Sequence, residues 1–111
     1  MVHLQPVWIG EYPFTATHVA LPKTNLLVIS NSIGYAMCGA LDIALLRTQL
    51  ASRGIVAVRA TGVKTISELL DGTVESCTQE AETLGIVCGM PIREALRLMG
   101  AAEQQQSTQN G

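Results

Sequence analysis

Aromatic residues, charged residues and pairs of cysteines are all scarce in this chain. Phe, Tyr and Trp make up 4% of its 111 residues and charged residues 14%, whereas charged residues average about 25% in soluble domains. The core must therefore consist mainly of Val, Ile, Leu, Ala and Met. Little charge remains to cover the surface, so we expect a second subunit to cover part of it, as in a homo-oligomer.

The same shortages argue against several classes of protein. The net charge is −2 and the seven basic residues are scattered, so neither a nucleic-acid partner nor membrane binding is expected. The uncharged run 24–41 contains Asn, Ser and Gly, which favours two strands and a turn over a membrane span. The three cysteines have no C-x-x-C spacing and MVHLQPVWIG lacks signal-peptide features, so the cytoplasm is the expected location.

The first third of the chain has the β-rich pattern of several short strands. Pro6 suggests that the first strand lies at a sheet edge or contains a bulge, and residues 10–13 supply a turn. Residues 31–34 are expected to close a hairpin. The strands predicted in this part are residues 2–9, 14–21, 26–31 and 35–38.

Two further strands are expected later in the chain. Residues 55–58 are apolar throughout, which is typical of a central strand covered on both faces. Residues 86–88 follow a glycine and predict a short strand. Together with the four N-terminal strands they indicate a mixed, largely antiparallel sheet of about six strands in an α/β (α+β) fold.

The helices are indicated by apolar spacing and by end signals. Residues 41–53 predict the main helix, packed on the sheet and ended by Arg53 and Gly54. Thr65 and Glu68 form a capping-box pattern that opens a short helix over 66–70. An acidic helix is expected at about 75–84.

The last predicted helix spans residues 91–99, with Pro91 at its first position. It has one apolar face, formed by Ile92, Ala95, Leu96 and Met99. We expect residues 1–100 to form a single α/β domain. Residues 101–111 are polar and rich in glutamine, which predicts a disordered tail.

Several short motifs occur in an order that resembles a known family. They are Pro22-Lys23-Thr24-Asn25, Gly34-Tyr35, MCGALD over 37–42, Arg53-Gly54-Ile55, Thr65-Ile66 with Leu69-Leu70, and Gly89-Met90 with Glu94-Ala95-Leu96. The set is similar to the YunC-like family, small bacterial and archaeal proteins classed as a domain of unknown function. The resemblance covers residues 1–99 and implies a small α/β domain that self-associates. It implies no established activity and no catalytic residue.

Cys38 and Asp42 are the candidates for catalysis. Cys38 stands just ahead of the predicted main helix, whose exposed amides would stabilise a thiolate, and Asp42 lies one turn further on. The simpler interpretation is that Cys38 packs as a small apolar side chain and Asp42 complements the helix dipole. A thiol enzyme also needs a base, and His3 and His18 are the only histidines. His18 could approach Cys38 only if its strand pairs beside the Cys38 strand, which nothing in the sequence fixes.

Four residues are candidates for contact with a small anionic ligand. Lys23 and Asn25 lie in a predicted turn, although Asn in turns more often bonds to the backbone. Arg59 and Lys64 are the other two, and Lys64 precedes a capped helix whose free amides can hold an anion. No P-loop and no G-x-G-x-x-G pattern occurs, so no particular ligand or cofactor is indicated.

An acidic stretch offers carboxylates for a divalent cation, although such a run is usually a solvated face. The cysteines and histidines stand singly, without zinc-site spacing. We therefore rank a self-associating binding or assembly module first, an enzyme using Cys38 and Asp42 second, and a metal-dependent protein third. The acidic residues are Glu68, Asp71, Glu75, Glu80 and Glu82.

Overall fold

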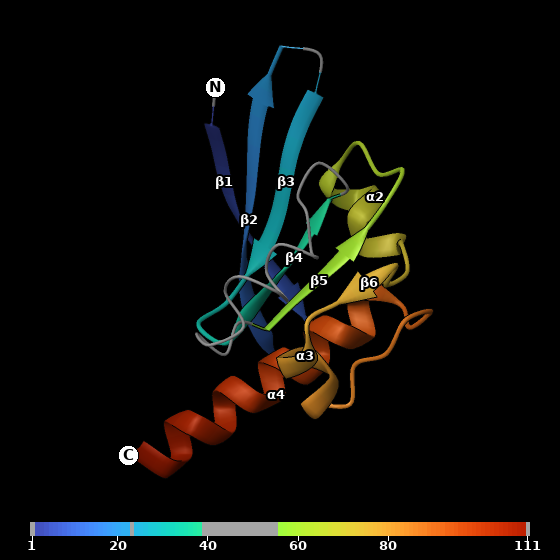
Figure 1. Cartoon of the computed structure of the whole chain (residues 1–111). Coiled ribbons are helices and arrows are strands. Elements are labelled where there is room, and N and C mark those ends of the chain that lie inside the picture. Colours follow the sequence, from blue (N-terminus) through green and yellow to red (C-terminus); the bar gives the residue numbers. More distant parts are fainter. Residues whose placement is uncertain (1, 23, 39–55, 111) are drawn as a thin grey trace.

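The described part of the chain forms one six-stranded sheet with three helices (Figure 1). The structure is a computed structural model and describes residues 2–22, 24–38 and 56–110. The strands, in both chain and sheet order, are β1 (Val2–Ile9), β2 (Tyr12–Leu21), β3 (Thr24–Ser30), β4 (Gly34–Cys38), β5 (Val56–Ala60) and β6 (Ser76–Cys77). The helices are α2 (Ile66–Asp71), α3 (Gln79–Thr83) and α4 (Ile92–Asn110).

The sheet is mixed and mainly antiparallel, which confirms the predicted fold class. Strands β1 to β4 pair antiparallel with their neighbours, β4 pairs parallel with β5, and β6 returns antiparallel to β5. A parallel pair needs a crossover connection between its strands. Residues 39–55 make that connection, and the predicted main helix over 41–53 lies among them, outside the described residues.

The strand predictions agree with the structure in most of their details. β1 lies at the sheet edge, as Pro6 indicated, and the predicted hairpin of residues 26–31 and 35–38 appears as β3 and β4. β5 lies between two other strands, and its residues Val56, Ala57 and Val58 are buried. These outcomes follow from local signals, because apolar runs and turn residues fix strands without distant contacts.

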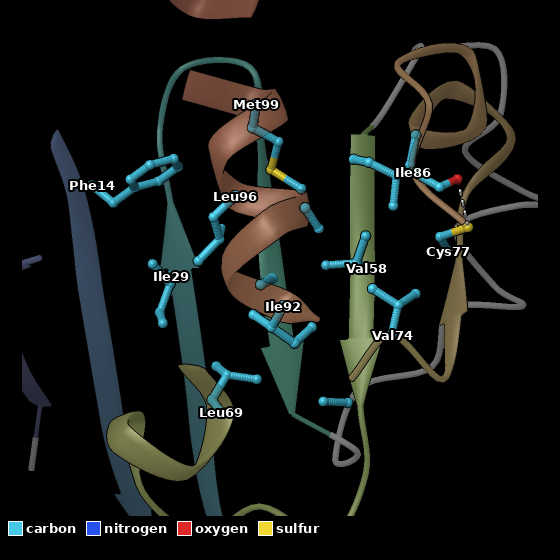
Figure 2. Packing of buried hydrophobic residues seen from close by; sticks show 14 of the residues in the cluster. Phe14, Ile29, Val58, Leu69, Val74, Cys77, Ile86, Ile92, Leu96 and Met99 are labelled. Carbon is cyan, nitrogen blue, oxygen red and sulfur yellow. Dashed lines mark hydrogen bonds between the residues drawn. The ribbon is translucent and has the colours of Figure 1, made fainter. Parts of the chain in front are cut away.

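One face of the sheet is covered by helices, and α4 makes the central contact (Figure 2). Figure 2 shows α4 crossing the sheet between Ile29 on β3 and Val58 on β5. The predicted apolar face of this helix is confirmed, since every member is fully buried in the main core. Those residues are Ile92, Ala95, Leu96 and Met99.

The region after α2 differs from the sequence prediction. The expected strand at 86–88 is absent, and the short strand of this region is β6, inside the predicted acidic helix 75–84. Thr78 explains the change: its Oγ1 accepts hydrogen bonds from the N–H of Ala57 on β5, at 3.1 Å, and of Ala81 in α3. It thereby extends the pairing of β6 and caps a shorter helix, which begins at Gln79.

Residues 86–88 have an apolar pattern for another reason. Ile86 is fully buried in the core and its carbonyl faces the Cys77 thiol on β6 (Figure 2). Gly85, just before it, has a φ of 92°, a left-handed conformation that turns the chain. A single buried side chain in a turn therefore produced the signal that we interpreted as a strand.

The C-terminal segment also differs from the expectation of a disordered tail. Helix α4 continues through Asn110, and Figure 1 shows its last turns extending beyond the sheet. Ala, Glu and Gln, which follow Gly100, have high helix propensity. Glu103 also accepts hydrogen bonds from the N–H and the hydroxyl of Ser32, at 2.8 and 2.6 Å. Among the described helices, none is both long and apolar enough to cross a membrane.

Gly100 provides a test of how closely α4 approaches β2. A Cβ built on Gly100 would lie 2.4 to 2.8 Å from three atoms of the Tyr12 side chain. Gly→Ala usually stabilises a helix by about 1 kcal/mol, whereas overpacking costs about 1–3 kcal/mol. We expect Gly100→Ala to lower the free energy of unfolding by about 1 kcal/mol, measured by urea denaturation.

The matched control for this substitution is the same change made in a Tyr12→Gly protein, which removes all three side-chain atoms, Cβ included, that the added methyl group would meet. Without that side chain, Gly100→Ala should be neutral or stabilising, because only the propensity term remains. Equal destabilisation in both backgrounds would show that the two residues do not meet.

Candidate functional site

Cys38, the first candidate for catalysis, is the last residue of β4 and is 2% exposed. Its Sγ accepts a hydrogen bond from the Leu27 N–H at 3.4 Å and donates to the Asn25 carbonyl at 3.5 Å. The second contact requires a proton on sulfur, because a carbonyl oxygen can only accept. The surroundings of Cys38 therefore suit a packed, hydrogen-bonded thiol.

Asn25, a candidate for ligand binding, bonds to a neighbouring strand. Its Oδ1 accepts a hydrogen bond from Nε2 of His18 at 3.0 Å. Asn25 pairs with Ala20 across the β2–β3 ladder, which places its side chain on the same sheet face as that of His18. Its side chain therefore links β2 and β3, whereas the sequence suggested a bond to the local backbone of the turn.

The two histidines, which stand singly in the sequence, are directly opposite each other in the sheet. The β1–β2 ladder pairs His3 with His18, and their ring centroids are 6.0 Å apart with a 42° tilt. On the other side of His18, the ladder continues to Leu27 on β3. That strand lies between His18 and Cys38, so neither histidine serves as a base beside the thiol.

The remaining candidates do not gather around Cys38. Arg59 pairs with Met37, one step along from the Cys38–Ala60 pair, so its side chain leaves the opposite face of the sheet; it forms an ion pair with Glu75 at 3.8 Å. Lys64 is exposed and follows β5. Lys23 and Asp42 lie outside the described residues.

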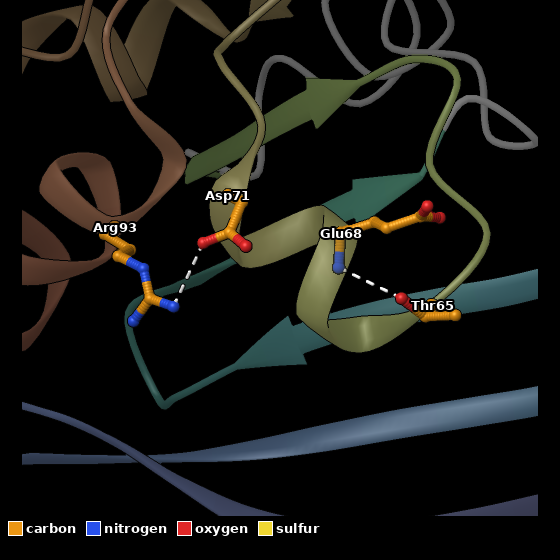
Figure 3. Close-up of polar contacts among 4 residues, drawn as sticks. All are labelled: Thr65, Glu68, Asp71 and Arg93. Atoms are coloured by element: carbon orange, nitrogen blue, oxygen red, sulfur yellow. Dashed lines mark hydrogen bonds and ion pairs between the residues drawn. The ribbon is translucent and has the colours of Figure 1, made fainter.

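The acidic residues are divided among separate structural contacts. Thr65 Oγ1 accepts from the Glu68 N–H at 3.0 Å, as the capping-box prediction requires, and Asp71 forms an ion pair with Arg93 at 3.2 Å (Figure 3). The Glu68 carboxylate accepts from the Lys64 N–H at 2.7 Å. Within the described ranges, no three His, Cys, Asp or Glu residues group closely enough to hold a metal ion.

An exposed apolar surface lies on β1, and the sequence analysis did not single it out. Val2, Leu4 and Trp8 are 59, 67 and 63% exposed, and alternation along the strand places them on one face together with Pro6. We call these four residues the apolar row. It lies on the sheet face opposite to α4, because Ile9, the neighbour of Trp8, is buried in the main core.

The same face is apolar further into the sheet. Met37 on β4 and Ala57 on β5 are buried there in a small second cluster, with Val28 and Tyr35 packed against them. Burial raises the pKa of the Tyr35 hydroxyl above its ordinary value near 10. On the described strands β1 to β4, this face carries no charged side chain.

Comparison with known proteins places the chain in a family. Residues 37–99 match the family model described as "Domain of unknown function (DUF1805)". The chain is also 58% identical, over 99 residues, to the uncharacterised protein YunC of Bacillus subtilis, an alignment that spans 89% of this chain and 98% of the relative. The chain belongs to the DUF1805 family. The YunC-like resemblance of its motifs is thereby confirmed.

A solved structure shares the DUF1805 fold described above. It is the crystal structure of a protein of unknown function from Thermoplasma acidophilum, with a TM-score of 0.80 and 33% sequence identity. The match covers 90% of this chain and 94% of that one. The segment matched by the DUF1805 family model includes Cys38 and the apolar face of α4, whereas the apolar row and the histidine pair lie before it.

The packing of the three thiols predicts their order of reaction. Cys38 and Cys77 are buried, at 2 and 3% exposed, and Cys88 is exposed. Iodoacetamide reacts with accessible thiolates. In the native protein at pH 7 we expect alkylation of Cys88 first, and of Cys38 and Cys77 only after unfolding, as measured by peptide mass spectrometry. If Cys38 reacts as fast as Cys88 in the native protein, the packed-thiol interpretation is wrong.

Proposed function

We propose that this DUF1805 protein is a self-associating binding or assembly module whose copies meet through the apolar row. The observation that carries the proposal is the exposure of Leu4 and Trp8, both more than 60% exposed on a strand at the sheet edge. Exposing large apolar side chains to water is unfavourable in proportion to their area. Contact with a second protein surface would remove that area from water.

The chemistry of the row matches the centre of a protein interface. Trp is enriched among the residues that dominate binding energy, and charged residues are depleted at interface centres. A standard interface buries about 800 Å² on each partner, which is more than the row provides alone. The half-buried Thr17 and Val19, which pair with Leu4 and Val2, would extend the contact onto β2.

A second copy of the chain is the partner that this surface fits best. An uncharged surface can meet its own copy without like-charge repulsion, and interfaces between identical subunits are more apolar than others. On the described strands of this face, a partner of strong negative charge would find one opposite charge, Arg59 on β5, which already pairs with Glu75, and a partner of strong positive charge would find none. The low overall content of charged residues, 14%, supports the same choice.

Pro6 favours a contact in which the sheet faces of two copies pack on each other over one in which two β1 strands pair edge to edge. Proline has no N–H to donate, so within sheets it weakens the edge on which it lies. A second β1 added edge to edge would therefore lose a hydrogen bond near the centre of the strand. Sheet faces that pack on each other, by contrast, need apolar side chains and no free backbone groups.

An enzyme that uses Cys38 with Asp42 ranks below this proposal. The thiol of Cys38 donates to a backbone carbonyl and is covered by Leu27 and other core residues. Neither histidine lies beside it, and an activated cysteine requires a base or a nearby positive charge. No described feature favours the enzyme over the assembly module.

Light scattering after size-exclusion chromatography tests the proposal. At micromolar concentration the unmodified protein should elute as a dimer or larger oligomer. Leu4→Glu places a charge at the centre of the row, and we expect it to weaken association at least tenfold, since hot-spot substitutions cost about 2 kcal/mol or more. Trp8→Ser should act in the same direction.

The control is Gln5→Glu, on the same exposed strand but on the other face. It adds the same charge one residue away and should leave the mass unchanged. A monomer for the unmodified protein would contradict self-association. An oligomer that is equally stable with Leu4→Glu would instead show that the copies meet elsewhere.

A further inference from the structure

We infer that His3 and His18 together form a binding site for a divalent transition-metal ion, with Asn25 positioning His18. The site lies on the opposite face of β1 from the apolar row and does not depend on self-association. Imidazole nitrogens are good ligands for Zn²⁺, Ni²⁺ and Cu²⁺. The two rings are the only imidazoles in the chain.

The antiparallel ladder brings the two rings into position. His3 and His18 are direct partners between β1 and β2, and directly opposed residues hold their Cβ atoms about 5 Å apart. His3 is exposed and His18 is half-buried, so water and ions reach the pair. Neither side chain needs a change in the backbone to approach the other.

The distance between the rings is close to that of two rings on one shared ion. A Zn–N bond is 2.0–2.1 Å and a ring nitrogen lies roughly 1.2 Å from the ring centroid, so two imidazoles on one tetrahedral ion hold their centroids about 5.3 Å apart. The observed separation is 6.0 Å, so the rings must approach each other by about 0.7 Å. Rotation of the side chains, without movement of the strands, would direct a nitrogen of each ring to a common point.

Asn25 supplies the outer contact that metal-binding histidines usually have. Its Oδ1 accepts from Nε2 of His18 at 3.0 Å, a contact in which Nε2 is the donor and Nδ1 is the nitrogen left to bind an ion. In metal sites the non-ligating ring nitrogen commonly donates to such an oxygen, which fixes the tautomer and orients the ring. The contact therefore prepares His18 to bind through Nδ1.

Two protein ligands leave the remaining coordination positions to water or to an external donor. The neighbours of the pair on this face are uncharged: Gln5 follows His3 on β1, and Ala16 and Leu27 flank His18. A bound ion would therefore meet no fixed positive charge from these side chains. The site would bind a metal ion that prefers imidazole ligands, such as Zn²⁺, Ni²⁺ or Cu²⁺, and would leave that ion exposed to solvent.

Calorimetric titration of the full chain with Zn²⁺ tests the inference. The protein should carry Cys88→Ser, because Cys88 is the exposed thiol and would compete for Zn²⁺. We expect one ion per chain, and at least a tenfold loss of affinity in His3→Gln and in His18→Gln. Asn25→Ala should also weaken binding about tenfold, the lower end of the effect seen for outer-shell partners.

The control is Gln5→Ala, a neighbouring polar side chain on the same face, which should leave the affinity unchanged. A second measurement needs no variant at the pair: Zn²⁺ should shift the NMR signals of both imidazole rings together. The inference is overturned if Zn²⁺ fails to bind at millimolar concentration, if either His→Gln variant binds as well as its parent, or if only one ring responds.

Discussion

The packing of α4 on one face of the sheet is the contact on which the rest of the structure depends. Its four fully buried residues meet the inward side chains of β2 to β5. The same helix holds the β3–β4 turn, because Asn31 Nδ2 donates to the Met99 carbonyl at 3.2 Å while its Oδ1 accepts from the N–H of Ile33 and Gly34. This contact joins residues that are far apart in the chain and sets where β4 begins.

The described packing leaves side chains of β1 exposed on both faces of the sheet. On the face under α4, the buried part of the sheet ends before the far end of β1, where His3 and Gln5 are exposed. On the opposite face, the apolar row has no cover among the described residues. Both features lie on the N-terminal hairpin, on the two faces of β1 and outside the core that α4 covers.

Much of the fold could be predicted from the sequence because its signals are local. The apolar spacing of α4 and the Thr65–Glu68 capping box each depend on residues within one or two turns. The error at 75–84 arose from a distant contact, since Thr78 bonds to Ala57 on β5. Residues 101–110 were interpreted from polarity alone, although their helix propensity and the bond from Ser32 to Glu103 favour a helix.

The histidine pair was missed because it depends on strand register. Ile9 pairs with Tyr12, so the connecting loop is Gly10-Glu11, a two-residue hairpin, which is among the commonest lengths. We instead assigned the turn to residues 10–13, which leaves the register undefined. Counting outward from a two-residue loop places His3 opposite His18.

Of the candidate site residues that were named from the sequence, Cys38 and Asn25 do contact each other, although this contact suits packing more than catalysis.

The central claim is that the apolar row of β1 is exposed in a single copy and becomes covered when copies meet. Trp8 is the only tryptophan in the chain, so its fluorescence reports directly on that surface. On raising the protein concentration from nanomolar to micromolar, the emission should shift to shorter wavelength and acrylamide quenching should decrease. An emission maximum and a quenching constant that stay at solvent-exposed values throughout would contradict the account.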